Sequence, residues 1–106
     1  MRTKEEITQA IKTQFVNVRE RGRILALALK ARADIAATRR RLRSTFADLG
    51  EATYERLEEG KTVGWGEDMG DYKLRIEGSQ AELRQREDAL KKIIERGEEK
   101  EEEERE

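Results

Sequence analysis

Apolar residues recur along residues 7–57 at steps of mostly three, four or seven, the spacing of one face of an α-helix. The set consists of Ile7, Ile11, Phe15, Val18, Leu25, Ala28 or Leu29, Ile35, Leu42, Phe46, Leu49, Thr53 and Leu57. Beside it, small residues repeat every seven positions at Ala31, Thr38, Thr45 and Ala52. Small side chains at this spacing would let a second helix approach closely.

Capping signals predict that this first helix covers residues about 3–59. Thr3 and Glu6 have the spacing of a capping box, and Gly60 is suited to the left-handed position after a helix. Gly22 and Gly50 interrupt the pattern, and each costs about 1 kcal/mol relative to alanine in a helix interior. We expect one continuous helix that tolerates both glycines. The alternative is a break at Gly22.

A second apolar pattern predicts a helix over residues about 71–97, after a loop over residues about 60–70. Asp71 is a suitable N-cap and Gly97 a plausible end. The face of this helix consists of Tyr72, Ile76, Ser79, Leu83, Leu90 and Ile93 or Ile94, in which Ile76, Leu83 and Leu90 have the heptad spacing. Residues 98–106 form a strongly acidic tail, which we expect to be solvated and frayed.

Two helices joined by about ten residues most simply lie antiparallel. The sequence therefore predicts an all-α fold, a coiled-coil-like antiparallel helical hairpin in a single domain over residues 1–97. Folding about residue 65 would pair residues whose numbers sum to about 130. This register also places Glu87 and Asp88 near the arginines of residues 39–43, and the acidic tail beside residues 24–32.

The second helix is too short to cover the first, so residues 7–29 form an extended N-terminal arm with an unpartnered apolar face. Such faces usually mark an interface. We expect the arm to self-associate into a helical bundle, as a dimer or higher oligomer, or to bind another helical protein. A fold-back at Gly22 into a three-helix bundle is the other solution. The residues predicted to bind a partner are Ile7, Ile11, Phe15, Val18, Ile24, Leu25, Leu29 and Trp65.

The composition limits the chemistry that is open to this chain. Charged residues make up 44% and apolar residues 35% of its 106 positions, and it contains no proline, cysteine or histidine. Without cysteine and histidine, thiolate nucleophiles, imidazole general bases and the usual zinc ligands are missing. Ser44 and Ser79 have no activating partner. We therefore expect a protein that is not an enzyme, with no cofactor, bound metal or small-molecule substrate.

The first residues do not have the pattern of a signal peptide, and the longest apolar run, ILALAL at residues 24–29, is far shorter than the roughly 20 residues of a bilayer span. We expect a soluble cytoplasmic protein without a membrane span. Because the stretch VRERGRILALALKAR mixes arginine with leucine and isoleucine, binding of residues 7–29 to a membrane surface is an alternative.

Charge is distributed unevenly although the net charge is only −1. Residues 19–43 contain nine basic and two acidic residues, whereas residues 95–106 contain eight acidic and three basic ones. The arginines at 39, 40, 41 and 43 are candidates for binding anions. Nucleic-acid or anionic-surface binding by Arg39, Arg40, Arg41 and Arg43, modulated by the acidic tail, is thus the alternative function, although no aromatic residues interleave for base stacking.

The loop GKTVGWGEDMGD at residues 60–71 contains the only tryptophan, Trp65. Tryptophan is favoured at interaction hot spots, so the loop is a candidate recognition site. The simpler interpretation is that Trp65, Val63 and Met69 fold back and cover the end of the coiled coil. Glu67, Asp68 and Asp71 lack the spacing of a calcium-binding loop, and GKT lacks the glycine and the strand that precede it in a phosphate-binding loop.

These observations predict a non-catalytic structural or adaptor protein that acts through helix–helix contacts. The arm over residues 7–29 is the predicted contact surface, and self-association is the favoured mode.

Overall fold

The computed structural model describes the backbone of residues 3–105, and the side chains in that range apart from those of residues 67, 68 and 104. It contains two helices, α1 (Lys4–Glu58) and α2 (Glu67–Arg105), and the described residues form no strand. The fold is an all-α helical hairpin with a long N-terminal helix, as the sequence predicted.

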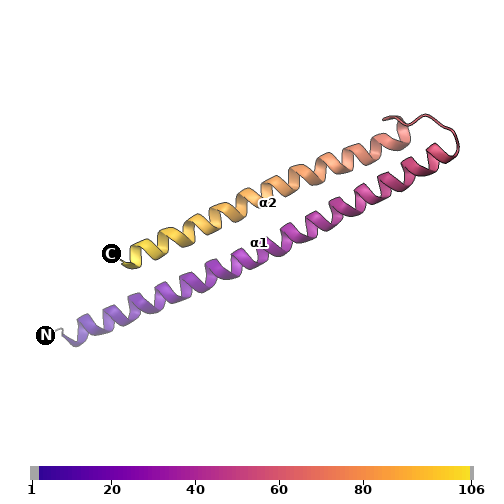
Figure 1. Ribbon diagram of the computed structural model, residues 1–106. Helices are drawn as coiled ribbons and strands as arrows, with labels where there is room; N and C mark the ends of the chain where they lie inside the picture. Colours follow the sequence, from indigo (N-terminus) through magenta and orange to yellow (C-terminus); the bar gives the residue numbers. More distant parts are fainter. Residues whose placement is uncertain (1–2, 106) are drawn as a thin grey trace. The chain divides into compact units, whose positions relative to one another are not determined.

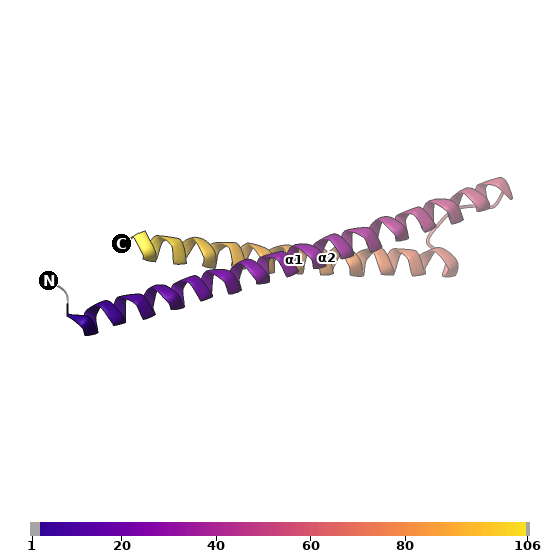
Figure 2. The same ribbon diagram turned by 90° about the horizontal axis from the view of Figure 1, so that it is seen from below.

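The helices contribute to two compact units. Of the described residues, unit 1 combines residues 3–32 with residues 89–105, and unit 2 comprises residues 33–88. In each unit a segment of α1 runs antiparallel to a segment of α2 (Figures 1 and 2).

Both predicted signals at the ends of α1 are present. The backbone N–H of Glu6 donates to Thr3 Oγ1 at 3.2 Å, and the backbone N–H of Thr3 donates to a Glu6 carboxylate oxygen at 3.3 Å, which completes the capping box. At the other end, Gly60 has a φ of 75°. Its N–H donates to the Leu57 carbonyl and that of Lys61 to the Arg56 carbonyl, the two bonds of a Schellman motif.

Helix α1 continues through both glycines, so the alternative break at Gly22 is wrong. No atom lies within 4 Å of a Cβ built on Gly22 or Gly50, so neither glycine marks a close approach within the hairpin. Packing and capping of this 55-residue helix offset the conformational cost of the two glycines.

The predicted bounds of α2 are wrong at both ends. The helix begins at Glu67 rather than Asp71, because Met69 is 2% exposed and anchors a turn that precedes Asp71. It also passes through Gly97 and reaches Arg105, so the described part of the acidic tail is helical. Glutamate is a good helix former, and Lys100 forms an ion pair with Glu103 at 3.6 Å in the last turns.

The main helix contacts follow the heptad pattern, with steps of three and four residues. In unit 2 the buried or half-buried residues of this pattern are Ile35, Thr38, Leu42, Thr45, Leu49 and Ala52 on α1, and Met69, Tyr72, Ile76, Ser79, Leu83 and Arg86 on α2. In unit 1 they are Asn17, Ile24, Ala28 and Ala31 on α1, and Leu90, Ile93, Gly97 and Lys100 on α2. Residues that flank the pattern and are also half-buried are Glu20, Asp34, Ala37, Thr53, Arg56, Gly70 and Glu82. The predicted small-residue row at 31, 38, 45 and 52 therefore does face α2.

The register differs from the predicted one. Contacts between the helices join Asp34 to Arg86, Arg39 to Glu87 and Arg41 to Glu82 in unit 2, and Glu20 to Arg96 in unit 1. The numbers of paired residues sum to 116–126 instead of about 130. The chain turns nearer to residue 62 than to residue 65, because α2 starts four residues earlier than expected.

Candidate interaction surfaces

Neighbouring residues of α1 in unit 1 have opposite environments. Ile24 is 8% exposed and lies against α2, whereas the next residue, Leu25, is 61% exposed. One residue corresponds to about 100° around a helix, so the face that contains Leu25 points well away from α2. Unit 1 therefore carries two apolar rows on α1, of which one is buried within the chain and one is open.

The open row consists of the predicted partner-binding residues of the arm, with the exception of Ile24. Its members are Ile7, Ile11, Phe15, Val18, Leu25 and Leu29, and each keeps between 47% and 62% of its surface exposed. We call this set the open apolar row. Gly22 belongs to it by position, since it continues the alternation of three and four residues between Val18 and Leu25.

Ile24 is not available to a partner, which corrects its place among the predicted binding residues. Its side chain lies 3.3 Å from the position that a Cβ on Gly97 would occupy. Because α2 extends to Arg105 in place of the predicted 97, it covers part of the arm that the predicted hairpin left bare. The Arg96 guanidinium also donates to the Glu20 carboxylate at 3.0 Å.

One side of the open apolar row borders the end of α2. A groove of about 370 Å³ is lined by Arg21, Leu25 and Ala28 from α1, by Ile94, Glu98 and Glu101 from α2, and by three further residues of the two helices. Ile94 is 39% exposed there. Glu98 and Glu101 were not predicted to belong to this surface, because the second helix was expected to end at Gly97. The continued spacing of Ile93, Gly97 and Lys100 was the signal that could have revealed it.

Basic residues border the row on its other side. On a helix with 3.6 residues per turn, Lys12, Arg19, Arg23 and Lys30 lie roughly 100–140° around α1 from the open row, on the side opposite to α2. All four are exposed, and none forms an ion pair with a described carboxylate. Around α1, unit 1 thus has an open apolar row, a basic edge and the face that packs on α2.

The loop before α2 does not cover the end of the hairpin as expected. Trp65 is 59% exposed and Val63 is 41% exposed, and only Met69 is buried. The Lys73 ammonium lies 6.0 Å from the centre of the indole ring, within the range of a weak cation–π contact. Trp65 and the exposed Leu74 line a shallow hollow at the start of α2.

The arginine cluster is partly occupied by carboxylates of its own chain. Arg39 pairs with Glu87 at 3.4 Å, which confirms the predicted proximity of Glu87, and Arg41 pairs with Glu82 at 3.2 Å. Arg40 and Arg43 are exposed and form no ion pair with a side chain that the structure describes. Two of the four predicted anion-binding arginines therefore already have a structural role in unit 2.

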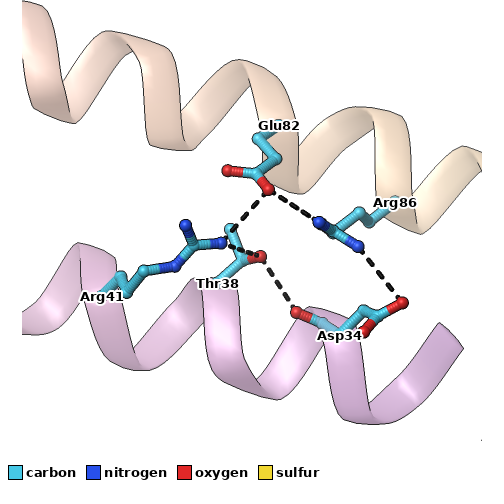
Figure 3. Close-up of polar contacts among 5 residues, drawn as sticks. All are labelled: Asp34, Thr38, Arg41, Glu82 and Arg86. Atoms are coloured by element: carbon cyan, nitrogen blue, oxygen red, sulfur yellow. Dashed lines mark hydrogen bonds and ion pairs between the residues drawn. The ribbon is translucent and has the colours of Figure 1, made fainter. Parts of the chain in front are cut away.

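A polar network surrounds Arg41 and links the two helices of unit 2 (Figure 3). The Arg86 guanidinium pairs with Glu82 at 2.8 Å and with Asp34 at 3.2 Å, and Arg41 donates to Thr38 Oγ1 at 3.2 Å. Thr38 is fully buried, and its hydroxyl donates to the Asp34 carbonyl at 2.9 Å. Every residue of this network has a hydrogen-bond or ion-pair partner, so the polar side chains at this contact between the helices are not left unsatisfied.

The charges of the network support one another. Hydrogen bonds from Arg86 and then from Arg41 hold the pKa of the Glu82 carboxyl below its ordinary value. The hydrogen bond with Glu82 in turn raises the pKa of Arg86. Both shifts favour the ionised pair, so the network is most stable when Glu82 is deprotonated.

The structure adds little to other kinds of site. No group of three or more potential metal ligands occurs among the residues that were described, although the side chains of Glu67 and Asp68 lie outside them. No helix in the described part of the chain is long and apolar enough to cross a membrane.

Comparisons of the chain with protein-family models, with curated proteins and with solved structures gave no significant match. The surfaces of the hairpin are therefore the only basis for a functional conclusion.

Proposed function

We propose that this protein is a non-catalytic structural or adaptor protein that acts through helix–helix contacts and self-associates through the arm, residues 7–29 of α1. The observation that carries the proposal is the open apolar row. Six large apolar side chains at helical spacing keep about half or more of their surface exposed in unit 1. A row of this extent on one helix face is typical of an interface.

The buried seam of unit 1 supports the same conclusion. Because α2 packs on Ile24 and Ala28, the residues of the open row keep between 47% and 62% of their surface exposed within the unit. Burial of large apolar side chains contributes roughly 1.5–3 kcal/mol each, so a second helix laid along the row would gain substantially. A separate chain is the simplest source of that helix.

The test is the solution mass of the protein with and without the row. We expect the wild-type chain to sediment above its monomer mass of 12.3 kDa at tens of micromolar. Leu25→Glu together with Leu29→Glu places two charges in the row and should return the protein to 12.3 kDa at the same concentration. The mass is measured by sedimentation equilibrium or light scattering.

A matched control exists on the same stretch of helix. Leu27 is 40% exposed, but it lies on the opposite side of α1 from the open row. Leu27→Glu should therefore keep the wild-type mass. A wild-type chain that stays monomeric up to about 100 µM, or equal masses for Leu27→Glu and for the variant with Leu25→Glu and Leu29→Glu, would contradict the proposal.

A further inference from the structure

The open apolar row lies between two edges of opposite charge, and the placement of these edges restricts how a second copy can dock. On one side are Lys12, Arg19, Arg23 and Lys30, the basic edge. On the other side, across the groove beside Leu25, are Glu98 and Glu101 of α2, the acidic edge, and Arg21 of α1 lines the same groove. Neither carboxylate of the acidic edge pairs with a described basic residue, so both remain exposed and available to a partner.

The two edges lie at the same level along the helices. Gly97 packs on Ile24, and Arg96 pairs with Glu20. Since α2 runs antiparallel to α1 in unit 1, residues 98–101 lie beside residues near 20–24 of α1. Arg19 and Arg23 on the basic edge are therefore at the level of Glu98 and Glu101 on the acidic edge.

We propose that a second copy of this chain docks on the open apolar row with its α1 parallel to the first, so that Arg19 and Arg23 of each copy face Glu98 and Glu101 of the other. This inference rests on the proposed self-association and specifies its orientation. A two-fold axis along the helices exchanges left and right edges, which brings each basic edge opposite an acidic edge. Both halves of the contact are then complementary in charge.

An antiparallel arrangement of the two copies is not complementary in charge. Its two-fold axis is perpendicular to the helices and leaves each edge on its own side, so Arg19 would face Arg19 of the second copy. Glu98 and Glu101 would likewise face their own counterparts. Like charges placed opposite one another are destabilising and act against such a pairing.

A lipid surface matches this site less well than a second copy. An anionic bilayer would attract the basic edge, but it would repel Glu98 and Glu101 beside the same apolar row. The required partner presents an apolar helix with an acidic edge on one side and a basic edge on the other. Unit 1 of a second copy has that composition.

Charge reversal with mixing tests the orientation. Arg19→Glu with Arg23→Glu makes one variant, and Glu98→Lys with Glu101→Lys makes another. Each variant alone has like charges at both edges in the parallel dimer, and we expect its association to weaken about tenfold or more at low salt. An equimolar mixture should restore association to about the wild-type strength, because every edge contact in the mixed dimer is attractive.

The results distinguish a failure of the proposed orientation from a failure of the proposed self-association. If L25E/L29E is monomeric but R19E/R23E associates as tightly as the wild type, the proposed function stands and this orientation is overturned. The orientation is also overturned if R19E/R23E binds the wild-type chain more tightly than the wild type binds itself, since that is the antiparallel result. A wild-type chain that is monomeric overturns both proposals.

A cysteine provides an independent measurement, because the chain has none of its own. Ile7→Cys places a thiol at the N-terminal end of the row. In the parallel dimer the two thiols meet, and mild oxidation should give a disulfide-linked dimer on a non-reducing gel. An antiparallel dimer with full overlap of the row separates them by about 33 Å, far beyond the roughly 7 Å limit between the Cα atoms of a disulfide. Failure to cross-link in a variant that keeps the wild-type mass would contradict the parallel arrangement.

Discussion

At the scale of the residue, a displacement by one position separates the inside of unit 1 from its open surface. Ile24 and Leu25 are both large and aliphatic, yet one is buried and the other is exposed. A step of about 100° around the helix is enough to change the neighbour from α2 to solvent. The position of a residue around the helix, and not its hydrophobicity, thus decides which of two adjacent apolar residues is buried.

Gly97 illustrates a residue whose role depends on its neighbour. It lies at a contact position of α2, where an added Cβ would be 3.3 Å from Ile24 Cγ2, whereas nothing lies within 4 Å of a Cβ on Gly78 of the same helix. Packing against Ile24 therefore favours glycine at position 97, whereas no such contact favours it at position 78.

We expect Gly78→Ala to raise the free energy of unfolding by about 1 kcal/mol, because alanine is the better helix former and the new methyl group meets open space. Gly97→Ala should leave stability at or below the wild-type value, because overpacking of about 1–3 kcal/mol opposes the same gain. Urea denaturation of both variants, at one protein concentration, measures the difference. An equal increase for both would show that α2 does not pack on Ile24 in this way.

At the scale of the helix, the alternation of three and four residues explains why these two segments pair. Each contact face contains only a few large apolar side chains, and small or polar ones such as Thr38 and Ser79 fill the remaining positions. The polar network among Asp34, Arg86 and their neighbours makes the contact between the two helices specific to one register. Such pairs contribute little stability at a surface but distinguish one register from another.

The network predicts an acid-sensitive contribution to stability. The pKa of Glu82 is lowered in the folded chain, whereas an unfolded glutamate titrates near 4.3. The contribution is therefore fully present above about pH 4.3 and is lost as the pH falls below that value through the folded-state pKa.

Glu82→Gln tests this contribution at the contact between the helices. We expect the urea midpoint of the variant to lie below that of the wild type at pH 7, and the difference to be smaller at about pH 3, below the unfolded-state pKa. The midpoint is followed by circular dichroism at 222 nm. A difference of the same size at both pH values would mean that the ionised carboxylate does not stabilise the fold.

At the scale of the whole molecule, assembly and stability are expected to be coupled. If only the folded chain self-associates, mass action stabilises it as concentration rises. We expect the melting temperature of the wild type to increase by a few degrees over a hundredfold range of concentration. The melting temperature of L25E/L29E should not change over that range. Differential scanning calorimetry at several concentrations measures it, and a constant wild-type value would argue against a folded oligomer.

Much of the hairpin could be predicted from the sequence because local rules determine it. Thr3, Glu6 and Gly60 specify the ends of α1 through capping, and the small-residue row at 31, 38, 45 and 52 indicated the side that meets α2. The heptad spacing of Ile76, Leu83 and Leu90 likewise indicated the contact face of α2. Each of these signals depends on residues close together in the chain, which is why periodicity detects it.

Only the tertiary structure decided where α2 begins and ends, how the helices are offset and which apolar row is buried. Gly97 is a reasonable helix end by propensity, but contact with Ile24 gives it a place inside α2, and the helix then continues into the acidic tail. Burial of Ile24 and exposure of Leu25 follow from that same contact. The physical reason is that periodicity identifies the faces of a helix, whereas the partner helix determines which of those faces remains open.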